Sequence, residues 1–286
     1  GCFDIKPVVV SLSPAANVVV TNPAAVCAPG TVDITAAAVT AGSSAGLTFT
    51  YWTDAAATIA YTTPTTATAG TYYIKGTTAA GCVDIKPVVV TINPLPAPVV
   101  TGPSPVCQSI AGSVETYSTP NVAGNTYTWT VVDNLNVTGE SAQITGQSSI
   151  SQTLTNNTNI VQTVTYTVTP KSGDAGACVG STFTITVSVN PKPVVPNQTA
   201  TICSGTAFSI VPVNSPTTTI IPPSTTYTWT VIDNVNVTGD AAQTIGVSTI
   251  GQTLTNLTNT AQTVVYTVTP TSGTTGNCVG ATFTVT

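Results

Sequence analysis

The chain has 286 residues, of which only 5% are charged, and five lysines against ten acidic residues give a net charge of −5 without any histidine or arginine. This balance excludes the basic surface that phosphate groups require, so we expect no nucleic-acid partner. No run approaches the roughly 18 apolar residues needed to cross a bilayer, so we expect no membrane-spanning segment.

Two internal repeats organise the chain. Residues 1–14 return as residues 81–94 with 10 of 14 positions identical, and residues 125–186 return as residues 225–286 with 42 of 62 identical. Such self-similarity predicts an array of similar modules, here interrupted at both ends of the sequence. Proline-rich joints suggest the following division: a terminal strand of a preceding module at 1–14, and modules at 15–94, 95–191 and 192–286, the last with a truncated final strand.

Strict alternation of apolar and hydroxyl side chains predicts β-strands. Tyr127, Trp129 and Val131 share one face of a strand that recurs at 227–231, and further alternating runs lie at 164–168 and 183–187. No window shows a helical period. We therefore predict an all-β fold of tandem immunoglobulin-like β-sandwiches with one disulfide per module. Each module has one tryptophan expected in its core: Trp52, Trp129 and Trp229.

Seven cysteines indicate disulfides, because the chain has neither histidine nor the Cys-x-x-Cys motif that would favour a metal site. Cys2 aligns with Cys82 in the repeat, so its partner is expected outside this sequence. The other six are expected to pair within modules, as Cys27–Cys82, Cys107–Cys178 and Cys203–Cys278. Such bridges form in an oxidising space outside the cytosol, which predicts an extracellular or cell-surface location.

Two segments resemble a known family. The sequence YTVTPTSGTTGNCVGATFTVT at 266–286, with its copy at 166–186, resembles the PKD-like repeat of Bacteroidota surface proteins, and residues 51–94 resemble the Ig-like module that accompanies it. The resemblance implies very large secreted proteins, exported by the type IX system and displayed on the cell surface, many of them similar to gliding and attachment adhesins. It implies no catalytic residue.

Oxygen-rich loops follow the strands that contain Trp129 and Trp229. Hard cations bind such oxygens, so these loops are candidate calcium sites, and we expect no other cofactor. The alternative is that Asp and Asn stabilise hairpin turns through hydrogen bonds to their own backbone. The candidate ligands in the two loops are Asp133, Asn136, Glu140, Asp233, Asn236 and Asp240.

The remaining residues suggest binding rather than catalysis. The ten carboxylates are scattered, and no two are spaced as an opposed acid pair, so we do not expect an enzyme. Tyr51, Trp52 and Tyr61 are candidates for a binding surface, although core filling is the alternative. Trp52 is out of phase with Phe49 and Tyr51, which predicts a bulge or an exposed indole.

The leading hypothesis is a structural or adhesive segment of a very long extracellular surface protein or filament, acting as a disulfide-stapled stalk. Its expected partners are neighbouring modules, copies of the same protein and surface glycans. Two alternatives stay open at this point. One is a glycan- or protein-binding module with exposed aromatics, and the other is a subunit that polymerises by adding its terminal strand, residues 1–14, to a neighbour.

Overall fold

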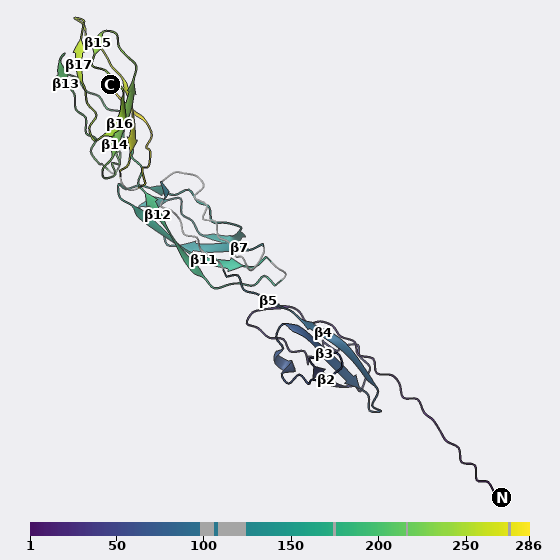
Figure 1. Cartoon of the computed structure of the whole chain (residues 1–286). Helices are drawn as coiled ribbons and strands as arrows, with labels where there is room; N and C mark the ends of the chain where they lie inside the picture. Colours follow the sequence, from purple (N-terminus) through teal and green to yellow (C-terminus); the bar gives the residue numbers. More distant parts are fainter. Residues whose placement is uncertain (98–105, 108–123, 174–175, 216, 274–275) are drawn as a thin grey trace. The chain divides into compact units, whose positions relative to one another are not determined.

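The computed structural model of the chain describes residues 1–97, 124–173, 176–215, 217–273 and 276–286, together with the backbone of 106–107. It divides into two units. Unit 1 contains Gly1–Ala97, Asn121–Gly124 and Lys171–Gly180, and unit 2 contains Pro98–Pro120, Asn125–Pro170 and Ser181–Thr286. Both are built from β-strands (Figure 1), and the described residues contain no α-helix, only the single 3-10 turn Pro64–Thr66. The predicted all-β fold is confirmed.

Unit 1 contains one antiparallel sheet in the order β2-β3-β4 and a short parallel pair of β1 with β5. The sheet is paired from Thr77 opposite Val83 to Gly70 opposite Val90. Tyr72 and Ile74 alternate inward along β3, as the period of two requires. The strands are β1 (Val26–Cys27), β2 (Thr48–Trp52), β3 (Gly70–Thr77), β4 (Val83–Val90) and β5 (Ile92–Asn93).

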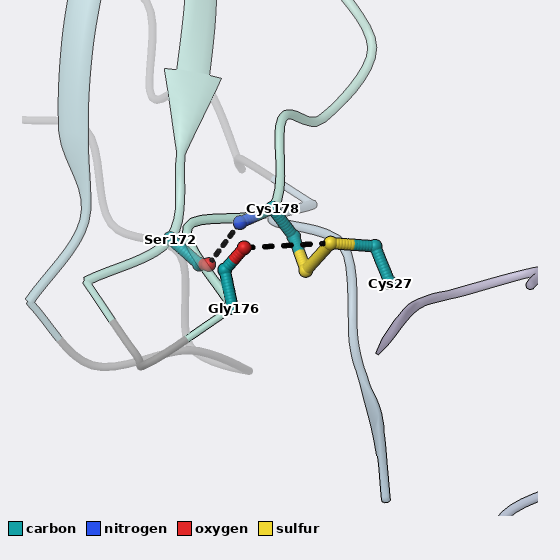
Figure 2. The surroundings of a disulfide bond; sticks show 4 residues. All are labelled: Cys27, Ser172, Gly176 and Cys178. Atoms are coloured by element: carbon teal, nitrogen blue, oxygen red, sulfur yellow. Dashed lines mark hydrogen bonds between the residues drawn. A yellow bond between two sulfur atoms is a disulfide. The ribbon is translucent and has the colours of Figure 1, made fainter. Parts of the chain in front are cut away.

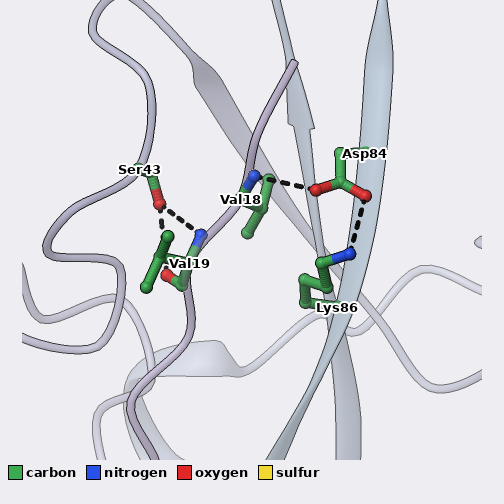
Figure 3. Close-up of polar contacts among 5 residues, drawn as sticks. All are labelled: Val18, Val19, Ser43, Asp84 and Lys86. Carbon is green, nitrogen blue, oxygen red and sulfur yellow. Dashed lines mark hydrogen bonds and ion pairs between the residues drawn. The ribbon is translucent and has the colours of Figure 1, made fainter. Parts of the chain in front are cut away.

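Side chains hold the segment before β1 in place (Figure 3). The Val18 amide donates to Asp84 Oδ2 at 2.8 Å, and Lys86 Nζ lies 3.2 Å from Asp84 Oδ1. One residue later, the Val19 amide donates to Ser43 Oγ at 2.9 Å, and the Ser43 hydroxyl donates back to the Val19 carbonyl at 3.1 Å. Asp84 therefore connects this irregular segment to the beginning of β4.

Residues 1–14 form no strand, although 10 of their 14 positions are repeated at 81–94, where β4 and β5 form. Phe3, Ile5 and Leu12 are at least 90% exposed. The difference between the copies is the partner, because β4 has β3 beside it over its whole length. Sequence alone does not make a strand without a sheet edge to join.

Unit 2 contains two copies of one arrangement. In the first, the strands form a sheet in the order β6-β12-β11-β7-β9 with a separate β10-β8 pair. The β11–β12 pairing is antiparallel and runs from Gln162 opposite Val189 to Val168 opposite Phe183. The strands are β6 (Val106–Cys107), β7 (Thr126–Val131), β8 (Val137–Thr138), β9 (Gln143–Gln147), β10 (Thr155–Asn156), β11 (Gln162–Lys171) and β12 (Phe183–Asn190).

The second copy has sheets in the orders β16-β14-β18-β19 and β13-β17-β15. Its first segment again runs parallel to its last strand, with Gln198 opposite Val285. The strands are β13 (Thr206–Ala207), β14 (Thr226–Val231), β15 (Val237–Thr238), β16 (Gln243–Val247), β17 (Thr253–Asn256), β18 (Tyr266–Thr271) and β19 (Phe283–Val285).

Three buried clusters form the cores, and each draws its residues from one of the segments 15–94, 95–191 and 192–286. In the two repeats the clusters are built from equivalent positions, including Trp129 with Tyr166 and Trp229 with Tyr266. The predicted inward positions on the strands around Trp129 are therefore confirmed. No helix in the described part of the chain is long and apolar enough to cross a bilayer.

Candidate functional site

A disulfide between Cys27 and Cys178 is the most distinctive feature of unit 1 (Figure 2). The two Cα atoms are 5.6 Å apart, which is within the usual range for a disulfide, and 151 residues separate the cysteines in sequence. Cys27 ends β1, and Cys178 lies in the loop between β11 and β12. The bridge therefore joins the first module to a loop that is continuous with the strands of the second.

The loop that carries Cys178 is held by two hydrogen bonds between Ser172 and Cys178. The Cys178 amide donates to Ser172 Oγ at 2.8 Å, and the Ser172 amide donates to the Cys178 carbonyl at 2.8 Å. The Gly176 carbonyl oxygen lies 3.7 Å from Cys27 Sγ. Because a disulfide sulfur carries no proton, this is a packing contact rather than a hydrogen bond. A side chain on Gly176 would collide with the Asn93 amide, so glycine permits the close approach.

This bridge contradicts the predicted pairing within modules. Cys27 binds Cys178 and not Cys82, which is a free thiol, and Cys178 is therefore unavailable to Cys107. Cys203 is also a free thiol, whereas Cys278 is disulfide-bonded, so the pair Cys203–Cys278 is wrong as well. The side chain of Cys107 lies outside the described residues.

The physical reason is the parallel pairing of each module's first and last strands. Cys27 lies opposite Asn93, at the end of the last strand, whereas Cys82 precedes β4 at its beginning. At about 3.3 Å per residue these positions are roughly 35 Å apart, far beyond the 7 Å that a disulfide can span. The prediction of one bridge inside each module is therefore corrected: the two cysteines of a module lie at its opposite ends.

Cys2 is exposed and carries a free thiol. It lies in residues 1–14, which form no strand. Its expected partner outside this sequence stays a prediction.

The candidate calcium loops are closed by hydrogen bonds to their own backbone. Glu140 Oε1 accepts from the Asn134 amide at 3.1 Å, and Asp240 Oδ2 accepts from the Asn234 amide at 3.0 Å. Asn134 Oδ1 also accepts from the amide of Asn136, as Asn234 does from Asn236. Asp133 and Asp233 are exposed. Calcium binding at these loops stays a prediction.

The candidate aromatics do not gather on one face. Tyr51 and Tyr61 pack against the core of the first module, and Tyr61 stacks on Tyr72 with ring centroids 4.3 Å apart. Trp52 lies outside that core cluster, half-buried, with Lys75 Nζ 5.7 Å from its ring centroid and its indole N–H donating to Thr50 Oγ1. The expected core role of Trp52 is therefore wrong, because β2 turns this side chain to the outer face.

Comparison with known proteins identifies the two repeats. Residues 104–193 and residues 200–286 each match the PKD-like domain family, and the two spans together exceed half of the chain. The chain belongs to the PKD-like domain family. No curated protein matches it.

Solved multidomain structures also align with the chain. The I-band fragment I67–I69 of titin is 11% identical, with 85% of this chain and 89% of that chain covered and a TM-score of 0.34. Mouse cadherin-23 EC22–24 is 14% identical, with 84% and 85% covered and a TM-score of 0.28. The human desmocollin-1 ectodomain is 11% identical, with 77% and 49% covered and a TM-score of 0.27.

Both PKD-like modules share a polar network that connects a buried tryptophan and a buried tyrosine to an exposed loop. In the first, the Trp129 indole donates to the Ser141 carbonyl at 2.9 Å, and Gln152 connects that residue to the Tyr166 hydroxyl, which donates to Gln152 Oε1 at 2.7 Å. In the second, the corresponding residues make the same bonds: Trp229, Ala241, Gln252 and Tyr266. Burial raises the pKa of Tyr166 and Tyr266, the latter to about 12. The network fixes the loop after β8 and its copy after β15.

The residues that position the bridge were not among the predicted site residues. Ser172 and Gly176 recur as Ser272 and Gly276, and the repeated pattern Ser-Gly-x-x-Gly-x-Cys-Val-Gly is visible in both copies. Cys278 and Ser272 exchange the same two hydrogen bonds, at 2.8 and 2.9 Å. The spacing between serine and cysteine is the same in the two copies, and this is the signal that would have identified a shaped hairpin.

Proposed function

We propose that this chain is a structural segment of a long extracellular surface protein, in which disulfides connect successive β-modules and carry tension between them. The observation that supports the proposal is the Cys27–Cys178 bridge, which joins positions 151 residues apart in different modules. When the chain is pulled, this disulfide bears the force in place of the residues between Cys27 and Cys178, which make up most of two modules. It also requires an oxidising compartment, as outside the cell.

The surface composition supports the same role. Thr165 and Thr186 pair across β11 and β12 with hydroxyl oxygens 3.2 Å apart, so hydroxyl groups occupy positions where lysine and glutamate are common. A weakly charged surface is little affected by salt, because few ion pairs are available for screening. We place the segment on the cell surface, as in the repeat proteins that its sequence resembles, and we propose no catalytic activity.

Single-molecule stretching of the intact chain tests this function. The oxidised chain is expected to stop extending at least about 500 Å short of the reduced chain, since the 151 residues between Cys27 and Cys178 can otherwise extend by up to 3.6 Å each. The Cys2→Ser variant is the control and should behave as the wild type. Equal final lengths in the oxidised and reduced states would refute the tension-bearing role.

A further inference from the structure

The hairpin between β11 and β12 packs on the module before it. Residues Lys171–Gly180 belong to unit 1 together with the first module, whereas Pro170 and Ser181, on either side of the hairpin, belong to unit 2. Figure 2 shows the described part of this hairpin at the disulfide, beside the end of β1. We call residues 171–180 and their copy at 271–280 the joint hairpins. The first joint hairpin is therefore the part of its module that contacts the preceding one.

The asparagine that ends β5 provides this contact. Asn93 precedes Pro94, and a Cβ atom on Gly176 would lie 3.0 Å from Asn93 Cγ and would collide with Asn93 Nδ2. The backbone of Gly176 is not in the left-handed region, so the close neighbour, and not a dihedral angle, requires glycine at this position. Asn93 Nδ2 is buried and has no hydrogen-bond partner among the described residues, so the amide acts here through its shape.

The second joint repeats the contact. Asn190 ends β12, precedes Pro191 and is 3% exposed, and a Cβ atom on Gly276 would lie 3.2 Å from Asn190 Cγ. The two asparagines belong to modules of different kinds, because residues 104–193 match the PKD-like family and residues 15–94 lie outside the matched spans. The contact therefore belongs to the joint and not to one type of module.

The other glycines of the hairpin pattern contact different neighbours. In the second joint hairpin, a Cβ atom on Gly273 would collide with the carbonyl oxygen of Ser224, which belongs to the same module. A Cβ atom on Gly280 would collide with the carbonyl oxygen of Pro193, in the segment that follows β12. The pattern Ser-Gly-x-x-Gly-x-Cys-Val-Gly thus describes a hairpin that fits between its own module, the connecting segment and the last strand of the preceding module.

We propose that the joint hairpin is a docking element, which recognises the asparagine at the end of a preceding module's last strand and holds the two modules together before their disulfide forms. Its partner is a β-module whose last strand ends in Asn-Pro. Asn93 lies opposite Cys27 in the β1–β5 register, so a hairpin docked on Asn93 brings Cys178 to Cys27, with Cα atoms 5.6 Å apart. The proposal extends the tension-bearing function proposed above, because docking selects the thiols that meet.

The equilibrium of the Cys27–Cys178 disulfide with glutathione measures docking. The two protein thiols react with one glutathione disulfide to give one protein disulfide and two glutathione thiols. The protein thiols lose two protons and two electrons, and the glutathione disulfide gains them. The equilibrium constant is the effective concentration of one protein thiol at the other, which is high when the hairpin is held in place and falls when it is released.

Two substitutions that compensate for each other test the proposal. Gly176→Ala places a methyl group in the space of the Asn93 amide, and Asn93→Ala vacates that space. We expect Gly176→Ala to lower the effective concentration at least tenfold, and the double variant to exceed Gly176→Ala at least threefold. The matched control is Asn190→Ala, which removes the same amide at the other joint and should leave the Cys27–Cys178 equilibrium unchanged.

The measurement uses the full chain with serine in place of Cys2, Cys82 and Cys203, which removes competing thiols. Acid-trapped samples from glutathione buffers of graded composition are digested, and peptide mass spectrometry gives the fraction of chains with the Cys27–Cys178 bridge. Circular dichroism and tryptophan fluorescence of the reduced variants show whether the modules are folded.

An unchanged equilibrium in Gly176→Ala, or a double variant no better than Gly176→Ala, would overturn the proposal. If Gly176→Ala unfolds the chain, the proposal requires that Asn93→Ala restore the fold, and a double variant that stays unfolded would overturn it as well. The stretching experiment examines the bridge under load. Its failure would refute the tension-bearing function and leave docking intact, whereas failure of the glutathione experiment would refute docking alone.

Discussion

At the scale of single residues, Gln152 is the side chain on which the polar network of the first PKD-like module depends. Its amide contacts the Tyr166 hydroxyl and both backbone groups of Ser141. Gln152→Ala leaves the hydroxyl of the buried Tyr166 without its acceptor, whereas the Ser141 carbonyl keeps the Trp129 indole, and we expect the free energy of unfolding to fall by about 1–3 kcal/mol. Urea denaturation followed by tryptophan fluorescence measures the change.

Ser151→Ala is the matched control for this substitution, because Ser151 is adjacent and exposed. Gln252→Ala should reproduce the loss in the second module, where Tyr266 donates to Gln252 at 2.9 Å. If Gln152→Ala were no more destabilising than Ser151→Ala, the network would contribute nothing to stability.

The buried tyrosines predict a loss of stability in alkaline solution. Burial raises the pKa of Tyr227 and Tyr266 to about 12, with a further contribution at Tyr266 from Asp240. The folded state therefore holds these protons more tightly than the unfolded chain, whose tyrosines ionise near pH 10. Their stabilising effect is complete below pH 10 and is lost as the pH rises from about 10 to 12. In an alkaline titration followed by tyrosinate absorbance and circular dichroism, one group of tyrosines should ionise only at the pH at which the fold is lost.

At the scale of elements, Asp84 connects the segment before β1 to β4. The Val18 amide, assisted by Lys86, lowers the pKa of Asp84 below its ordinary value. Its contribution to stability is therefore present above about pH 4 and is lost as the pH falls through the lowered pKa. Because the Asp84 side chain is 21% exposed, we expect an effect of about 1 kcal/mol or less.

Asp84→Asn removes this titration and should flatten the acid limb of the stability curve of the first module. Acid titration of the unfolding free energy makes the comparison. Asp4→Asn is the control, since the Asp4–Lys6 pair is more than three-quarters exposed and is expected to contribute little. An identical acid limb in wild type and Asp84→Asn would refute the role of this carboxylate.

The strands were predictable because their signal is local. Five residues are enough to indicate one buried face, that of Tyr127, Trp129 and Val131. Burial alternates along β7 as that pattern requires. The disulfides were not predictable in this way. The parallel pairing of Val26 with Ile92 places the first strand of the module beside its last strand. This pairing decides at which spatial end of the module Cys27 lies, and it connects residues far apart in the sequence. The environment of Trp52 was predictable only in part. Its phase in β2 indicated an outward side chain, but nothing in the sequence indicated that Lys75 lies over its ring.

At the scale of the whole molecule, the Cys27–Cys178 bridge should dominate the stability of the regions that it encloses. In the chain-entropy model, closing a segment of 151 residues contributes about 5 kcal/mol. We expect Cys178→Ser to lower the midpoint of urea unfolding markedly under non-reducing conditions. Cys82→Ser, which removes a free thiol, should leave the midpoint of the single chain unchanged. Equal midpoints for the two variants would show that the bridge does not stabilise the fold.

The placement of Cys27 and Cys82 at opposite ends of their module also sets an order of events during biogenesis. Cys82 follows Cys27 by 55 residues, so it emerges from the ribosome or export channel long before Cys178. Oxidation of the nascent chain would trap the nearer, incorrect pair. β-modules fold in milliseconds to seconds, whereas disulfides take seconds to hours to form. The first module therefore folds before its thiols react. Its strands then keep Cys82 away from Cys27 until Cys178 has been synthesised.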